Sequence, residues 1–185
     1  MASLSSQSGN PAPVTLVLGG ARSGKSRFAE SLLPKAGQRI YLATAEARDE
    51  EMRARILDHQ ARRGEGWHTI EAPLDIATPI VQAGRDAVLV DCLTLWLSNL
   101  MSARLNIDEA TAGLSQALSK AQAPVVLVSN EVGLGIVPDN ALAREFRDHA
   151  GRVNQAIAAA AARVFFIAAG LPLTLKNNAV KDTTI

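Results

Sequence analysis

The chain has 185 residues, of which 48% are hydrophobic and 20% charged, a composition that excludes global disorder and suits one folded domain. Its formal net charge of +1 gives no overall attraction to nucleic acid or acidic membranes, and its one cysteine excludes an intrachain disulfide. No apolar run is long enough to cross a bilayer, and the first residues lack the pattern of a secretory signal. We therefore expect a soluble cytoplasmic protein with no nucleic-acid partner and no membrane span.

The two ends of the chain differ in composition from its middle. Residues 1–13 are rich in Ser, Gly and Pro and predict a flexible leader, and residues 177–185 predict a loose polar tail. Residues 14–176 contain no linker, internal repeat or low-complexity tract. This pattern predicts a single domain over residues 14–176.

Short apolar runs alternate with longer amphipathic stretches along this domain, as expected when parallel strands are buried on both faces by helices. The predicted strands are 14–18, 40–43, 87–91, 124–129 and 164–168, with a weaker strand at 68–71 and an edge strand at 171–176. The predicted helices are 25–33, 48–63, 75–83, 93–102, 108–120 and 140–163. Alternating strands and helices predict an α/β domain with right-handed crossovers.

A glycine-rich segment directly follows the first predicted strand. It reads GGARSGKS and fits the pattern G-x-x-x-x-G-K-S between a strand and a helix. Backbone N–H groups of such a loop surround phosphate oxygens, and the helix start adds the positive end of its dipole. Lys25 is expected to reach the β- and γ-phosphates, and the Ser26 hydroxyl to bind Mg²⁺. The candidate nucleotide-binding residues here are Gly19, Gly20, Ala21, Arg22, Ser23, Gly24, Lys25 and Ser26.

The glycine-rich motif narrows the predicted α/β fold to one class. The domain is expected to be P-loop NTPase-like (RecA-like), with a mostly parallel sheet, helices on both faces and a possible antiparallel edge strand. The alternative interpretation of the motif is a glycine-rich turn that binds nothing.

An acidic residue ends the predicted strand at 87–91. Asp91 would lie at the carboxyl edge of the sheet, beside the phosphate loop, where a carboxylate can bind Mg²⁺ or nucleotide. The alternative role is an N-cap for the helix that begins near Leu93. The neighbouring Cys92 is expected to be a small buried side chain.

A histidine lies within a helix that is charged on most of its faces. At helical spacing, His59 shares a face with Arg55, Arg62 and Arg63. Nearby cations favour the neutral imidazole, the form that can attack phosphorus, and they stabilise negative charge on the phosphoryl group. Without further information, a histidine on such a helix is more often solvated surface.

Four motifs taken together resemble a known enzyme family. They are GGARSGKS, DEEM-x-x-R-I-x-x-H-x-x-R-R, VDCLTLWL-x-N and NEVG-x-GIVP, and the similarity runs from about Val14 to Lys176. The family is the bifunctional adenosylcobinamide kinase/adenosylcobinamide-phosphate guanylyltransferase of cobalamin biosynthesis.

The resemblance implies two reactions. Adenosylcobinamide is phosphorylated from ATP or GTP, and GTP then transfers its guanylyl group to adenosylcobinamide phosphate and releases pyrophosphate. The position that matches the family's guanylylated histidine is His59. The resemblance also implies that the protein is a homotrimer. The further nucleotide contacts that the resemblance implies are Thr44, Ala45, Glu46, Arg63, Gly64, Glu65, Gly66, Glu71 and Asp91. Glu71 has a carboxylate suited to a guanine edge, although Glu46, Glu65 and Glu71 are equally consistent with plain surface or strand-end acids.

The segment 130–138 follows a predicted strand and is expected to line the substrate crevice. Pro138 occupies the place of the third glycine of a dinucleotide fingerprint, so that motif is excluded. Arg152 and Asn154 are expected to be exposed polar positions on the long helix, where they could meet corrinoid, a neighbouring subunit or solvent. Trp67 and Trp96 are expected to serve packing rather than base stacking, and His68 and His149 are expected to be structural.

Two other functions are compatible with the phosphate loop alone. One is a P-loop kinase with a single activity on another small molecule, and the other is a RecA-like ATPase or nucleotide-sensing module. The near-zero net charge and the lack of an aromatic stacking stripe argue against a nucleic-acid ATPase.

Overall fold

The computed structural model describes residues 13–45 and 66–178. The predicted leader up to residue 12, the end of the predicted tail and the predicted helix at 48–63 lie outside these residues. The strands are β1 (Val14–Gly19), β2 (Arg39–Ala43), β3 (Trp67–Glu71), β4 (Ala87–Asp91), β5 (Val125–Asn130), β6 (Arg163–Ala168) and β7 (Leu171–Asn177). The helices are α1 (Lys25–Ser31), α3 (Ala77–Gln82), α4 (Leu93–Ser102), α5 (Ile107–Lys120) and α6 (Ala141–Ala160).

The strands form one seven-stranded sheet in the order β3-β2-β4-β5-β1-β6-β7. Strands β1 to β6 pair in parallel, and β7 pairs antiparallel with β6 at the edge of the sheet. Both the mostly parallel sheet and the antiparallel edge strand are confirmed. Pro172 lies in this edge strand opposite Ile167, where a residue without an N–H donor is tolerated.

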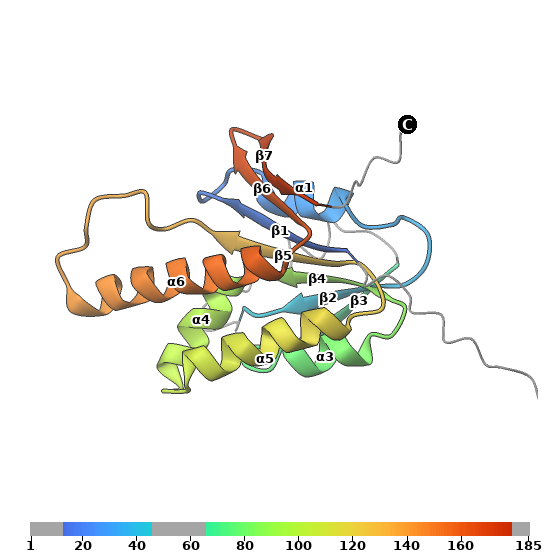
Figure 1. Ribbon diagram of the computed structural model, residues 1–185, viewed down its shortest axis with the longest axis horizontal. Coiled ribbons are helices and arrows are strands. Elements are labelled where there is room, and N and C mark those ends of the chain that lie inside the picture. Colours follow the sequence, from blue (N-terminus) through green and yellow to red (C-terminus); the bar gives the residue numbers. More distant parts are fainter. Residues whose placement is uncertain (1–12, 46–65, 179–185) are drawn as a thin grey trace, which may run out of the picture.

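Helices cover both faces of the sheet, as predicted (Figure 1). Leu16 and Leu42 are fully buried on the face that packs against α3, α4, α5 and α6. Val17 and Leu89 are fully buried on the opposite face, which packs against α1. The central strands are therefore mostly apolar on both faces, and each fully buried Leu or Val contributes about 1.5–3 kcal/mol. No helix in the described residues is long and apolar enough to cross a membrane.

Helix α6 ends earlier than the predicted helix at 140–163. Its C-cap is Ala161, whose backbone is already extended (ψ 141°). Arg163 and Val164 belong to β6, which pairs with β1. The helix ends before the predicted residue 163 because the β-branched and aromatic residues of this segment favour a strand.

Asn154 is buried, so its predicted exposure is wrong. Only 6% of the residue is exposed, and its Nδ2 donates to the carbonyl of Asn130 (3.4 Å). Asn154 lies three residues before the buried Ile157 and so shares its face. Because α6 contacts both α4 and α5, its buried stripe is wide enough to include this polar position.

Two further helices are shorter than predicted. Helix α1 ends at Ser31 rather than at residue 33, and α3 covers Ala77–Gln82 rather than 75–83. Asp75 lies before α3, where its Oδ1 accepts a hydrogen bond from the Thr78 N–H (3.0 Å). The carboxylate therefore competes with a helical conformation for Asp75 itself and caps the turn that follows.

Candidate nucleotide-binding site

The phosphate-loop motif lies between β1 and α1. Gly19 is the last residue of β1, and Lys25 and Ser26 occupy the first turn of α1. The N-cap of α1 is Gly24, whose φ of 97° is left-handed and therefore favours glycine. The Lys25 Nζ donates to the carbonyl of Gly20 (2.8 Å), so the lysine lies across the loop that it belongs to.

Backbone from two neighbouring strands closes on this loop. The Glu131 N–H, directly after β5, donates to the Gly19 carbonyl (3.1 Å). The Gly170 N–H, in the turn between β6 and β7, donates to the Ser23 carbonyl (2.9 Å). A Cβ on Gly19 would lie 2.5 Å from the Ile167 carbonyl oxygen, which is too close unless the backbone of β1 or β6 moves. The first glycine of the motif is therefore required by the packing of β1 against β6.

Lys25 and Cys92 are both buried, and burial disfavours the charged form of each side chain. Burial lowers the pKa of Lys25, and electrostatic interactions with Cys92 and Asp91 oppose that shift. Burial, followed by the Asp91 carboxylate, raises the pKa of the Cys92 thiol. At neutral pH Cys92 is therefore a thiol and not a nucleophile, which agrees with its predicted packing role. Asp91 is then the anion that favours the ammonium of Lys25.

Asp91 ends β4 on the face that α1 covers. Its Oδ2 accepts a hydrogen bond from the hydroxyl of the buried Tyr41 on β2 (2.8 Å). The N-cap of α4 is Cys92, without a capping hydrogen bond from its side chain, so the alternative role of Asp91 as the cap is wrong. The carboxylate instead lies beside Lys25, close to the phosphate loop.

A buried polar network joins the carboxyl ends of the central strands. The Thr44 hydroxyl donates to the Cys92 carbonyl (2.9 Å) and accepts from the Cys92 N–H (2.8 Å). Asn99 on α4 donates to the carbonyls of Thr44 (2.8 Å) and Pro73 (3.1 Å). Asn130 at the end of β5 donates to the Thr94 hydroxyl (2.7 Å).

Sequence reasoning missed Tyr41, Thr94, Asn99 and Asn130 as parts of this site. Three of them stand within the motifs quoted above, VDCLTLWL-x-N and NEVG-x-GIVP, as polar positions in otherwise apolar segments. That contrast is a usable signal, because a polar side chain in an apolar run needs a buried partner. Tyr41 carried no such signal, since a tyrosine in a strand is ordinary.

The structure brings some of the other predicted contacts to the same edge of the sheet. Thr44 and Ala45 directly follow β2, and Ala43 is in register with both Asp91 and Glu71. Glu71 therefore lies two strand spacings from Asp91, roughly 10 Å. The predicted residues outside the described part of the chain are Glu46, His59, Arg63, Gly64 and Glu65.

Gly66 lies at the opposite end of the sheet. It precedes β3, and its carbonyl accepts a hydrogen bond from the N–H of Arg39, the first residue of β2 (3.1 Å). The length of β3, about 15 Å, separates this end from the carboxyl edge. The structure thus does not bring Gly66 together with the phosphate loop.

Comparison with known proteins adds to this geometry. A family model described as cobinamide kinase / cobinamide phosphate guanyltransferase matches residues 15–175. The chain belongs to this family. It is 48% identical to the bifunctional adenosylcobalamin biosynthesis protein CobP of Pseudomonas aeruginosa, covering 88% of this chain and 96% of that one. It is 44% identical to the protein CobU of the same description from Salmonella typhimurium, covering 87% and 98%. The predicted family and the extent of the resemblance are confirmed.

Solved structures with little sequence identity share the fold of this family member. A protein from Pyrococcus horikoshii OT3 has a TM-score of 0.55 at 10% identity, covering 92% of this chain and 88% of that one. An ATPase from the type III secretion system of pathogenic bacteria has a TM-score of 0.54 at 9% identity, covering 88% and 56%. These likenesses confirm the P-loop NTPase-like fold and show nothing about substrate.

Replacing the first glycine of the motif tests the packing of the phosphate loop. In Gly19→Ala the new methyl group overlaps the Ile167 carbonyl, and we expect a loss of about 2–3 kcal/mol in the free energy of unfolding. We also expect weaker nucleotide binding, measured with a fluorescent GTP analogue. Gly20→Ala is the matched control for stability, because a Cβ there meets nothing within 4 Å. Equal unfolding free energies for the two variants would contradict the packing argument.

The contact between Tyr41 and Asp91 allows a second test. Tyr41→Phe keeps the ring and removes the hydroxyl, leaving the Asp91 carboxylate without this donor. We expect the free energy of unfolding at pH 7 to fall by about 1–2 kcal/mol, measured by urea denaturation. Asp91→Asn in the Tyr41→Phe background should then cost less than in the wild type. Additive effects of the two substitutions would show that the contact contributes nothing.

Proposed function

We propose that this protein carries both activities of its family. It phosphorylates the hydroxyl of adenosylcobinamide with ATP or GTP, and then transfers GMP from GTP to adenosylcobinamide phosphate through His59. The observation that carries the first activity is the phosphate loop in its strand–loop–helix setting, with Lys25 and Asp91 beside it. The family match over residues 15–175 supports the second. Resemblance to the family also leads us to propose a homotrimeric cytoplasmic enzyme.

In the kinase step, the acceptor oxygen bonds to the γ-phosphorus while the bond from that phosphorus to the β,γ-bridging oxygen breaks. The hydroxyl proton leaves to solvent or base, and the nucleoside diphosphate departs. The backbone N–H groups of the loop hold the phosphate chain, and the ammonium of Lys25 stabilises charge on the β- and γ-phosphates. These residues position and neutralise the reactants, which is most of what phosphoryl transfer requires.

The residues of the site fit a magnesium ion. The Ser26 hydroxyl and the Asp91 carboxylate are hard oxygen ligands, and Mg²⁺ is usually held by one or two such groups together with substrate phosphates. Tyr41 donates to one oxygen of Asp91 and so orients the carboxylate. When bound, the ion would neutralise charge on the phosphate oxygens.

In the second step, an imidazole nitrogen of His59 bonds to the α-phosphorus of GTP, and the bond to pyrophosphate breaks. The phosphate of adenosylcobinamide phosphate then attacks the same phosphorus, and the phosphorus–nitrogen bond breaks. A covalent intermediate divides one difficult displacement between two anions into two easier steps. Of the remaining predicted contacts, Thr44, Ala45 and Glu71 share the edge of the sheet at which the phosphate loop lies.

The role of Lys25 predicts a specific kinetic defect. Lys25→Met keeps most of the side-chain volume and removes the charge, so we expect phosphorylation of adenosylcobinamide to fall about 100-fold or more. Transfer of labelled γ-phosphate to adenosylcobinamide measures this rate. Lys35→Met, at an exposed lysine, is the matched control and should behave as the wild type. Activity retained by Lys25→Met would exclude the proposed kinase site.

The role of His59 predicts a covalent label. Incubation with Mg²⁺ and GTP labelled at the α-phosphate should give an acid-labile, base-stable guanylyl group on the wild type and none on His59→Ala. His59→Ala should retain most of the phosphorylation activity, and His149→Ala, on α6, is the control for loss of a histidine. A wild type that phosphorylates adenosylcobinamide but never acquires label would be a kinase with a single activity. ATP hydrolysis without either transfer would indicate an ATPase or nucleotide sensor.

A further inference from the structure

The loop between β5 and α6, residues 131–140, exposes a continuous apolar segment. All six residues from 132 to 137, with the sequence VGLGIV, are exposed, and none has a polar side chain. The exposed fractions are 80% for Leu134, 97% for Ile136 and 62% for Val137. The loop extends beyond the carboxyl edge of the sheet (Figure 1). A run of this length is unfavourable in water and therefore indicates a surface that becomes covered.

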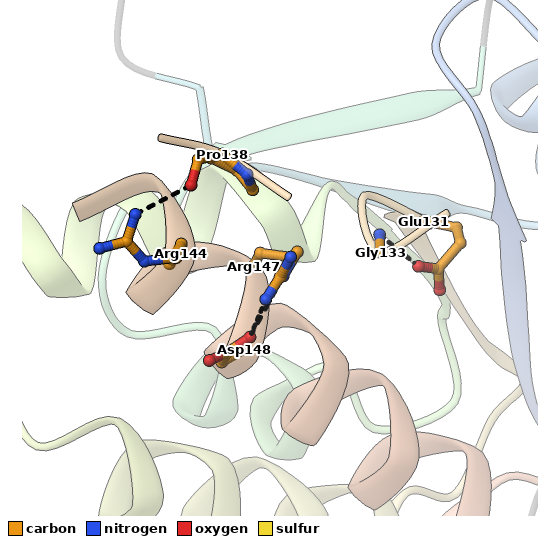
Figure 2. A network of polar contacts seen from close by, with 6 residues as sticks. All are labelled: Glu131, Gly133, Pro138, Arg144, Arg147 and Asp148. Carbon is orange, nitrogen blue, oxygen red and sulfur yellow. Dashed lines mark hydrogen bonds and ion pairs between the residues drawn. The ribbon is translucent and has the colours of Figure 1, made fainter. Parts of the chain in front are cut away.

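Polar contacts brace the loop at both of its ends. At the start, the Glu131 carboxylate accepts a hydrogen bond from the Gly133 N–H (2.6 Å). At the end, Arg144 donates to the carbonyls of Pro138 (2.9 Å) and Asp139 (2.7 Å), and Asn140 caps α6. Figure 2 shows the contacts of Glu131 and Arg144 on either side of the loop. The conformation of the loop is therefore set without burial of its aliphatic side chains.

The same loop begins at the phosphate site. The Glu131 N–H donates to the carbonyl of Gly19, the first glycine of the motif (3.1 Å). The acceptor hydroxyl must approach the γ-phosphate that this motif holds. A large acceptor that places its hydroxyl there has to extend over the surface next to the motif, and the β5–α6 loop forms part of that surface.

We propose that residues 132–137 bind one face of the corrin macrocycle of adenosylcobinamide. The inference rests on the proposed function, because it takes adenosylcobinamide as the acceptor. A corrin ring is broad and nearly flat, with methyl groups on its faces and amide arms at its rim. Leu134, Ile136 and Val137 supply apolar contact to such a face, and burying them against it removes apolar surface from water.

Gly135 gives this proposal an independent argument. A Cβ on Gly135 would meet nothing within 4 Å, and its backbone is not left-handed, so the fold itself does not require glycine there. Gly133 differs, since a Cβ there would lie 2.8 Å from the Glu131 carboxylate that braces the loop. A glycine between two aliphatic residues keeps the surface low enough for a flat ring to approach both of them.

The experiment measures binding of adenosylcobinamide by equilibrium dialysis, using its visible absorbance, in the presence of a non-hydrolysable GTP analogue. We expect Ile136→Ser and Gly135→Ala each to raise the Kd of adenosylcobinamide about tenfold. Val81→Ser, at a half-exposed aliphatic position on α3, is the matched control and should leave this Kd unchanged. Each thermal midpoint should stay within about 3 °C of the wild type, because the altered side chains are exposed.

Sedimentation velocity of the same variants tests whether residues 132–137 instead contact a second copy of the chain. Variants that sediment as a smaller species than the wild type would overturn the proposal, because the loop would then be a subunit interface. An unchanged Kd in both loop variants, with a wild type that binds and phosphorylates adenosylcobinamide, would overturn the inference and leave the proposed function standing. A wild type that neither binds nor phosphorylates it would overturn both.

Discussion

The phosphate loop keeps its shape because main-chain atoms of neighbouring strands close on it from both sides. Glu131 and Gly170 each donate a backbone hydrogen bond to the loop, and Gly19 approaches the Ile167 carbonyl too closely for any side chain. Main-chain groups in a sheet cannot move aside as side chains can. The geometry of the candidate nucleotide site is therefore fixed by the order of the strands, in which β1 lies between β5 and β6.

The neighbouring edge of the sheet is held by side chains. The Thr44 hydroxyl donates to the Cys92 carbonyl and accepts from the Cys92 N–H. The Asn99 amide donates to the carbonyls of Thr44 and Pro73. Loss of a partner in such a buried network leaves a polar group unsatisfied, at a cost of about 1–3 kcal/mol. Asp91 directly precedes Cys92, so the network that fixes the ends of β2 and β4 also fixes the carboxylate proposed to bind magnesium.

The amino-acid sequence predicted those parts of the site that depend on local pattern. The motif from Gly19 to Ser26, the acid at the end of β4 and the parallel sheet follow from spacing and from apolar runs, and the structure confirms each position. The network was not predicted, because Thr44 and Asn99 are 55 residues apart and meet only through the packing of α4 on the sheet. Local patterns carry no information about such contacts.

Two other differences between the prediction and the structure also arise from tertiary packing. Glu71 and Gly66 are close in sequence and were assigned together to the nucleotide, yet a whole strand separates them, so they lie at opposite ends of the sheet. Asn154 was expected to be exposed because it is polar, but its place on α6 is set by contacts with two helices at once. Residue type predicts burial poorly where a helix is covered on more than one side.

Lys25 links the fold to the proposed chemistry. The side chain of Lys25 is largely buried, and burial lowers the pKa of its ammonium, while the nearby carboxylate of Asp91 favours the charged form. Its hydrogen-bond acceptor is the neutral carbonyl of Gly20. A phosphate oxygen is a stronger acceptor because it is charged, and it would raise the pKa of the ammonium. Under the proposed function, nucleotide binding would be coupled to the protonation of Lys25 and to the exchange of its acceptor from the loop backbone to the phosphate chain. A bound triphosphate would offset the cost of burying this cation, so such a site would favour polyanions over neutral ligands.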